Sequence, residues 1–323
     1  MLLHAALAKI ILLAFLIVCS SHAAVAEAPS REHFAVWQVL DVKSRYPIPS
    51  EQWLTVLATQ DVIYLGEEHR NQWHIEAALQ VLRALFDKGR RPVLGMEMFG
   101  WDGQAALNQY GTNAELARDQ FLKDAHWDEN WGGTFADYEP LISFARTRRV
   151  PVLALNPPRR LVRKVAVQGW KNAIDDPEMM TWGMKDEPTV EDAAYREVIL
   201  RQLQLCHGGL PQDAYERMYE ASMFRDEGMA KTIDDSLHSA SHDSSSIAGP
   251  IVSYTGGGHI QYQLPIPKRV LRKHQGAVRQ KSVYMTSFEP DHPEQVQELL
   301  DNAIADYVWL TPIGAHGPAK RCR

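Results

Sequence analysis

Residues 61–69 read DVIYLGEEH, and this stretch decides the fold class. Residues 61–65 form a short apolar run that is typical of a buried strand, and Gly66 ends that run. Apolar residues then recur at helix spacing between Ile75 and Phe86. The stretch therefore predicts a buried strand that leads, through a polar turn, into an amphipathic helix.

The same strand-to-helix rhythm recurs along the chain. Further strands are expected at residues 91–97, 151–155, 251–255, 281–288 and 307–310, and a further helix at residues 138–148. Strand patterns nearly vanish between residues 159 and 237, where helical patterns replace them. We therefore predict an α/β fold, with a mainly parallel sheet flanked by helices and a smaller all-helical subdomain.

The domain organisation follows from these patterns. We expect residues 55–290 to form the α/β domain, after an N-terminal lead-in at residues 27–54 and before a C-terminal extension at residues 291–323. Residues 238–246 are polar and rich in serine, which predicts a mobile connector between the helical segment and the next strand.

The composition limits the class of protein. The 323 residues are 45% hydrophobic and 23% charged, which excludes a disordered chain, a collagen-like repeat and a disulfide-dense miniprotein. The net charge of -6 argues against a dedicated nucleic-acid binder, because such proteins carry a basic surface. We therefore expect no nucleic-acid partner.

Residues 1–30 have the features of an export signal. Lys9 precedes the apolar run at residues 10–18, and Ala-Val-Ala at residues 24–26 matches the pattern that a signal peptidase accepts. We therefore expect residues 1–26 to be a signal peptide for the Sec pathway, which predicts a periplasmic or membrane-associated protein.

The three cysteines divide between this export segment and the rest of the chain. Cys19 is a candidate for lipidation, but Val18 stands where a bacterial lipoprotein site has glycine or alanine, so the sequence favours simple cleavage. Cleavage leaves Cys206 and Cys322 as one candidate disulfide pair in an oxidising compartment.

Polar motifs follow three of the expected strands, and they hold the candidate site. The motifs are Gly66–His69, Gly95–Phe99 and Tyr254–His259. Because ligands bind at the carboxyl ends of the strands of a parallel sheet, we expect four of their side chains to converge there: Glu68, His69, Glu97 and His259. The set predicts either a general acid–base cluster or a divalent-metal site formed by His69, Glu97 and His259.

Each motif also has a structural interpretation. The carboxylates after Gly66 favour the start of the following helix, and Glu97 would be neutralised in a salt bridge with Arg159 or Arg160. The three glycines before His259 allow a ligand to approach the backbone, but no nucleotide-binding glycine pattern is present, so a nucleotide site is not expected.

The order of the motifs resembles the ChaN-like family, bacterial haem-binding uptake proteins of the Tiki superfamily. The resemblance spans roughly residues 55–290 and rests on YLGEEH (64–69), RPVLGMEMF (91–99), HWDENWG (126–132) with YEPLISFAR (138–146), PVLALNPPRRLVRKVA (151–166), FRDEGMAKTI (224–233) and YTGGGHIQYQLPIPKR (254–269). Because the segments occur in the family's order, the resemblance is far more specific than any single motif.

The resemblance implies a fold, a ligand and partners. It implies a parallel sheet with a smaller helical part, and haem binding for iron acquisition, with haem held between subunits of a homodimer. Outer-membrane haem uptake components are the further partners it implies. The wider superfamily includes hydrolases and metalloproteases, whose active-site residues correspond to His69, Glu97 and His259, with Glu68 at the neighbouring position. Family members that are lipoproteins carry a lipidated cysteine, to which Cys19 would correspond.

Haem as the cofactor requires an axial ligand and cations for the propionates. The candidate iron ligands are Tyr215, Tyr219 and His207, and the candidate propionate partners are Arg159 and Lys268. The alternative function is a hydrolase, with or without a metal, that uses Glu68, His69, Glu97 and His259. A third interpretation is an exported interaction module whose strand-end residues are a relic site.

Overall fold

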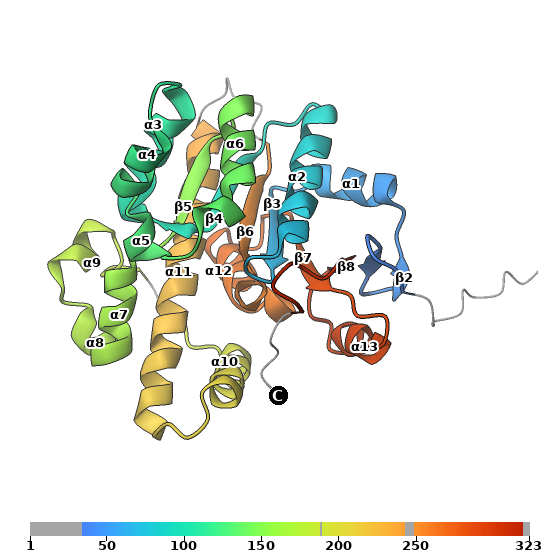
Figure 1. Ribbon diagram of the computed structural model, residues 1–323. Helices are drawn as coiled ribbons and strands as arrows, with labels where there is room; N and C mark the ends of the chain where they lie inside the picture. Colours follow the sequence, from blue (N-terminus) through green and yellow to red (C-terminus); the bar gives the residue numbers. More distant parts are fainter. Residues whose placement is uncertain (1–33, 188, 243–248, 319–323) are drawn as a thin grey trace, which may run out of the picture. The chain divides into compact units, whose positions relative to one another are not determined.

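Eight strands form a single sheet in the order β2-β1-β8-β7-β3-β6-β4-β5 (Figure 1). The strands are β1 (Val39–Asp41), β2 (Tyr46–Pro47), β3 (Val62–Glu67), β4 (Val93–Gly100), β5 (Val152–Asn156), β6 (Ile251–Gly256), β7 (Gln280–Ser287) and β8 (Tyr307–Thr311). Strands β8, β7, β3, β6, β4 and β5 are parallel, whereas β1 is antiparallel to both β2 and β8. The predicted α/β fold with a mainly parallel sheet is confirmed.

The computed structural model describes residues 34–187, 189–242 and 249–318. The expected signal peptide, Cys19 and Cys322 lie outside the described residues. Within the described part, no helix combines the length and hydropathy needed to cross a bilayer.

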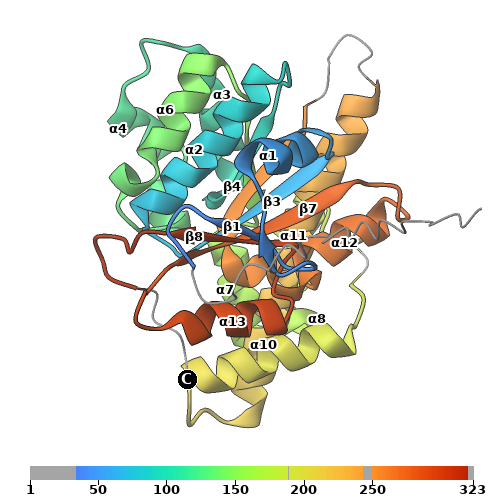
Figure 2. The ribbon, with the colours of Figure 1, turned by 90° about the vertical axis from the view of Figure 1, so that its right-hand side faces the viewer.

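Helices cover both faces of the sheet (Figures 1 and 2). In β3, Ile63 and Leu65 pack into one apolar cluster, while Val62 and Tyr64 pack into another, because successive side chains of a strand point to opposite faces. The first cluster is shared with α1 (Ser50–Ala58), α2 (Gln72–Asp87), α3 (Gln104–Thr112), α4 (Arg118–Asp124), α5 (Trp127–Asn130) and α6 (Glu139–Arg148). The second is shared with α11 (Gln212–His242) and α12 (Ile266–Lys273).

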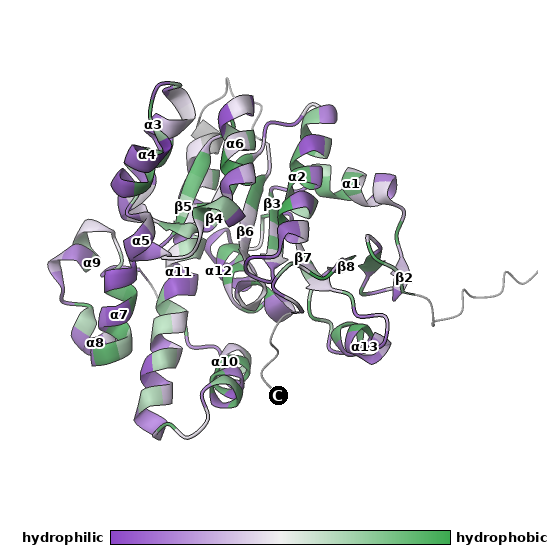
Figure 3. Cartoon of the chain, in the orientation of Figure 1, coloured by the Kyte–Doolittle hydropathy of each residue, from purple (hydrophilic) through white to green (hydrophobic). Residues whose placement is uncertain are grey.

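The hydropathy of the residues follows this layering: the strands between the two helical layers are mostly hydrophobic (Figure 3). At one end of the sheet, α13 (Pro293–Asp301) packs against Leu40 of β1 and Val308 of β8 in a further cluster. Short 3-10 turns connect several elements: η1 (Trp101–Gly103), η2 (Phe135–Asp137), η3 (Gly257–His259) and η4 (Gln261–Gln263). The core is therefore built from the strands expected from the sequence together with β1, which was not expected.

Between β5 and β6 the described residues are entirely helical or irregular. The helices are α7 (Arg159–Gln168), α8 (Trp170–Ala173), α9 (Pro177–Thr181), α10 (Ala193–Cys206) and α11. Asp192 begins α10, since its side chain accepts bonds from the backbone N–H groups of Ala194 and Tyr195. Helices α10 and α11 form a hairpin that extends away from the sheet (Figure 1). The hairpin has an apolar core of its own, made by Tyr195, Ile199, Tyr219 and Met223.

The prediction of a connector at residues 238–246 is wrong for its first five residues, because α11 continues to His242. Two contacts support this last turn. Asp234 and His238 interact at helix spacing, and the ring of His238 packs against the ring of His274. Residues 243–246 lie outside the described residues.

Candidate functional site

Three neighbouring strand ends bring His69, Glu97 and His259 to one edge of the sheet. Strand β6 lies between β3 and β4, so Gly256, its last residue, lies between His69 and Glu97. A Cβ atom on Gly256 would lie 2.9 Å from Nε2 of His69 and 3.5 Å from Oε2 of Glu97. A larger residue at this position would push the ring of His69 away from β6.

Glu97 is fully enclosed, and both of its carboxylate oxygens are bonded. Its Oε1 accepts a hydrogen bond from Nη2 of Arg225 at 2.5 Å and lies 3.2 Å from Nε2 of His259. Its Oε2 accepts a bond from the backbone N–H of Gly256 at 2.7 Å. Burial alone would raise the pKa of Glu97, but the charges of His259 and Arg225 outweigh burial and hold the pKa well below its ordinary value.

His259 lies between two carboxylates. Its Nδ1 is 2.6 Å from Oδ1 of Asp226, and its Nε2 faces Glu97. Asp226 is itself oriented by the hydroxyl of Tyr195, which donates to Oδ2 at 2.6 Å. Burial opposes the charged imidazolium, yet Glu97 and Asp226 raise the pKa of His259 to about 9. His259 therefore carries a proton on each ring nitrogen at neutral pH.

His69 forms a second histidine–carboxylate pair, with Glu67. Its Nδ1 lies 2.8 Å from Oε1 of Glu67, which also accepts a bond from the hydroxyl of Tyr138 at 3.0 Å, while Oε2 of Glu67 accepts one from the hydroxyl of Tyr254 at 2.7 Å. The His69 side chain is 45% exposed, and its ring contacts the edge of Trp131. Burial lowers the pKa of His69, but the bond to Glu67 and the charge of Glu97 outweigh it, so the pKa is raised.

Glu68 does not join this arrangement. Its carboxylate accepts hydrogen bonds from Thr286 Oγ1 at 2.8 Å and Ser287 Oγ at 2.5 Å, both at the end of β7. Successive residues at a strand end point in opposite directions, so Glu67 faces His69 while Glu68 faces the neighbouring strand. We define the rim cluster as Glu67, His69, Glu97, Arg225, Asp226 and His259.

Sequence reasoning missed Glu67, Arg225, Asp226 and Tyr195. Arg225 and Asp226 begin a run of three charged residues in α11, but the local sequence does not show that the two reach the strand ends. Arg225, rather than Arg159 or Arg160, is the cation that pairs with Glu97. Arg160 pairs instead with Asp102 and Glu178.

The rim cluster is poorly suited to a divalent cation as its side chains stand. Glu97 is already engaged by a guanidinium, an imidazole and a backbone N–H, and the positive charge of Arg225 would repel a metal ion. These contacts do not favour a metal ion bound by His69, Glu97 and His259, and that site stays a prediction.

The three candidate haem ligands lie on the hairpin of α10 and α11. The Tyr215 hydroxyl donates to the backbone oxygen of His207 at 2.6 Å and accepts from the N–H of Leu210 at 3.3 Å. The buried Tyr219 hydroxyl donates to Glu191 at 3.1 Å, and burial with the charge of Glu191 raises its pKa to about 12. Both phenols are engaged within the packing.

His207 differs from the two tyrosines because it is exposed. It follows the last residue of α10, and two exposed leucines flank it: Leu205 is 49% exposed and Leu210 is 42% exposed. We call residues 205–211 the hairpin tip. Gln212 and Asp226 are roughly 21 Å apart along α11 at 1.5 Å per residue, whereas Gln202, three residues before Leu205 on α10, accepts a hydrogen bond from Gln261 at 2.8 Å.

The two candidate propionate partners lie elsewhere. Arg159 begins α7 and donates to the backbone oxygen of Trp131 at 3.3 Å, which places it beside the rim cluster. Lys268 is exposed on α12 and forms an ion pair with Asp192.

Comparison with known proteins gives both a family and a fold. A family model described as haem-binding uptake, Tiki superfamily, ChaN matches residues 53–270, which include the rim cluster and the hairpin tip. The structure is similar to that of ChaN from Campylobacter jejuni, described as binding haem cofacially, with a TM-score of 0.62 and 17% identity. The match covers 84% of this chain and 95% of that chain. At this identity the likeness shows the fold.

Two further proteins are more distant. An erythromycin esterase in its open conformation matches with a TM-score of 0.44 and 12% identity, over 78% of this chain and 76% of that chain. The protein RETICULATA-RELATED 5, chloroplastic, of Arabidopsis thaliana is 21% identical over 267 residues, which is 77% of this chain and 34% of that protein. The chain thus spans about a third of the length of this curated relative.

Proposed function

Because the chain belongs to the ChaN family of haem-binding uptake proteins in the Tiki superfamily, we propose that it is an exported protein that binds haem at the hairpin tip. The observation that carries this proposal is the exposed imidazole of His207 between the exposed side chains of Leu205 and Leu210. Together, these side chains offer an apolar surface and an imidazole nitrogen at one turn, which are the groups that a haem site requires.

The residues of the hairpin tip fit the chemistry of haem. Haem iron takes a histidine or tyrosine as axial ligand, and the porphyrin requires apolar walls. Tyr215 holds the backbone of the tip through its bonds to His207 and Leu210, which leaves His207 as the available ligand. Exposed Arg201 lies one turn before Leu205 on the same face of α10, where its charge suits a propionate.

A single hairpin tip covers only one side of a flat porphyrin. We propose that a second copy of the chain covers the other side and brings its own haem, which agrees with the cofacial haem in the description of the Campylobacter jejuni protein. His207 would supply a nitrogen ligand to the haem iron, and Leu205 and Leu210 would cover the porphyrin and exclude water from it. Export by the expected signal peptide would place this binding where outer-membrane haem uptake components operate.

The test is a haemin titration of the purified protein followed by its Soret absorption and by sedimentation. We expect a saturable Soret shift near one haem per chain and a haem-dependent dimer. The variant under test is His207→Ala. Its matched control is His292→Ala, because His292 is an exposed histidine beside α13 with no exposed leucine flanking it. A spectrum that only scales with added haemin, without saturation, would contradict the proposal.

The rim cluster favours a second candidate function, hydrolysis of an ester or peptide. The specific observation is the pair of Glu67 and His69, in which a buried carboxylate holds Nδ1 and the ring is partly open to solvent. Such a pair orients a general base toward a water molecule. Turnover should then rise with pH through the raised pKa of His69, because the base acts when deprotonated. Unchanged ester turnover in His69→Ala would exclude this role.

A further inference from the structure

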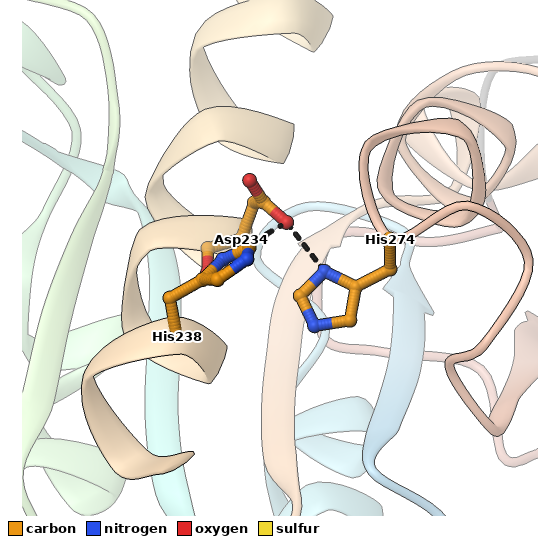
Figure 4. Close-up of side chains that lie close together, drawn as sticks. All are labelled: Asp234, His238 and His274. Atoms are coloured by element: carbon orange, nitrogen blue, oxygen red, sulfur yellow. Dashed lines mark hydrogen bonds and ion pairs between the residues drawn. The ribbon is translucent and has the colours of Figure 1, made fainter. Parts of the chain in front are cut away.

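A cluster of two histidines and one aspartate lies outside the rim cluster and the hairpin tip. Asp234 and His238 are one turn apart on α11, and His274 directly follows α12 (Figure 4). The three side chains point toward one another. Ile233 and Val270, near the cluster on the same two helices, are both completely buried in one apolar cluster, so the helices hold these side chains in a fixed relation.

The ligand atoms of this cluster are close enough for one ion. Nδ1 of His274 is 2.5 Å from Oδ1 of Asp234. Nδ1 of His238 is 3.5 Å from the same oxygen and donates to the backbone oxygen of Asp234 at 2.9 Å, which leaves Nε2 of His238 for an ion. One potential ligand atom from each residue lies within 4.8 Å of the others. Zinc bonds to nitrogen and oxygen are roughly 2 Å long, so one ion can bind ligand atoms about 4 Å apart. Small rotations of the three side chains would bring their ligand atoms to this separation.

The chemistry of the three groups suits a borderline divalent metal. Imidazole nitrogens and a carboxylate are the ligands that Zn²⁺ and its neighbours in the first transition row prefer. The ring centroids of His238 and His274 are 4.7 Å apart, so both imidazoles can approach one ion. Three protein ligands also leave a fourth position for water or a substrate.

The surroundings give an ion access from solvent. The His238 side chain is 59% exposed, while Asp234 and His274 are largely covered. His274 also lines a cavity of about 670 Å³, whose wall includes Asp61, Val93, Pro151 and Ile251. These residues stand at the amino ends of β3, β4, β5 and β6. The cavity therefore opens at the edge of the sheet opposite the rim cluster.

We propose that Asp234, His238 and His274 form a binding site for a divalent transition-metal ion, with Zn²⁺ as the probe. The site is independent of haem binding, because it shares no residue with the hairpin tip. It also differs from the rim cluster in having no arginine bonded to its carboxylate among the contacts that the described residues show.

The experiment uses the full chain without an affinity tag, stripped of metal and titrated with Zn²⁺ against a chromophoric chelator. We expect about one Zn²⁺ per chain with a Kd on the order of 1 μM or tighter. His238→Ala and His274→Ala should each weaken binding at least tenfold, roughly, whereas the matched control His292→Ala should not. Because His238 is exposed, His238→Ala keeps the test valid if His274→Ala disturbs folding.

Two results would overturn the proposal. One is the absence of saturable Zn²⁺ binding, or binding that neither variant changes. The other is binding that His69→Ala abolishes and His274→Ala retains, which would assign the ion to the rim cluster. Replacing Zn²⁺ by Co²⁺ adds a spectroscopic readout, since the visible absorption of Co²⁺ changes when imidazole ligands are lost. Zn²⁺ binding that persists in His207→Ala separates this site from haem.

Discussion

The rim cluster and the hairpin tip both present histidine, but their surroundings differ. In the rim cluster, His259 is 15% exposed and has a carboxylate at each ring nitrogen. At the hairpin tip, His207 is exposed and stands between two exposed leucines. A histidine with both ring nitrogens engaged stabilises a fold or moves protons, whereas a histidine at an apolar, exposed turn is available to a ligand.

The two regions also differ in what holds them. Ion pairs around buried Glu97 connect β4, β6 and α11 in the rim cluster, so that a lost partner leaves a buried charge without compensation. The hairpin tip is held by the hydroxyl of Tyr215, by the disulfide bond of Cys206 and by the apolar core of its own helices. Changes in the rim cluster should therefore act on stability, and changes at the tip on ligand binding.

The largest effect is expected from Glu97→Ala. Its loss leaves Arg225, His259 and the N–H of Gly256 without their shared acceptor, which should lower the free energy of unfolding by about 3–5 kcal/mol. Urea unfolding measures the loss of free energy. Glu129 is exposed, so the control Glu129→Ala should change stability by no more than about 0.5 kcal/mol. A loss no larger than that of the control would remove the distinction between the two regions.

The pH dependence of stability tests the same region through His259. Its pKa is about 9 in the folded protein and 6.5 ordinarily, so its contribution is fully present below pH 6.5 and is lost as the pH rises through about 9. The contribution is on the order of 3 kcal/mol. Unfolding free energies measured across this range should fall more steeply in the native protein than in His259→Gln. Parallel slopes would mean that His259 is not charged in the fold.

The next effect is expected at the tip. Leu205→Asp and Leu210→Asp should each weaken haem binding about tenfold. Each substitution removes a leucine whose burial against the porphyrin would contribute roughly 1.5 kcal/mol or more to the binding free energy. Stability should change by no more than about 0.5 kcal/mol, since both side chains are exposed. Paired haemin titrations and urea curves measure both quantities. A variant that loses stability but binds haem normally would reverse the assignment of the tip.

The smallest effect is expected from Tyr215→Phe. It removes the hydrogen bond that the hydroxyl donates to the backbone of His207 and the one that it accepts from the N–H of Leu210, at a cost of about 1 kcal/mol of stability, while haem affinity stays within about twofold. Tyr219→Phe should behave in the same way, because its hydroxyl is committed to Glu191. A large loss of Soret intensity in either variant would make that tyrosine the iron ligand and displace His207.

Much of the fold could be predicted because its signals are local. Apolar runs such as residues 62–65 and the helix spacing of residues 75–86 depend only on neighbours in sequence. The short strands β1 and β2 were missed, since two or three residues carry no periodicity. The end of α11 was misjudged because its last turn is supported by His274, a contact distant in sequence.

The candidate site was predictable only in part. Strand ends at one edge of a parallel sheet implied that His69, Glu97 and His259 would meet. The choice between Glu67 and Glu68 depends on which way each side chain points, and adjacent glutamates look alike in sequence. Arg225 and Asp226 reach the cluster because α11 crosses the strand ends, which no local pattern encodes.

The most direct test of haem binding at the hairpin tip is a haemin titration of His207→Ala and His69→Ala side by side with the native protein. We expect His69→Ala to bind haem with native affinity and the native Soret position. We expect His207→Ala to lose at least about tenfold in affinity, or roughly 1.4 kcal/mol, with its fold intact. Native binding by His207→Ala together with loss of binding by His69→Ala would contradict haem binding at the tip and assign the haem to the rim cluster.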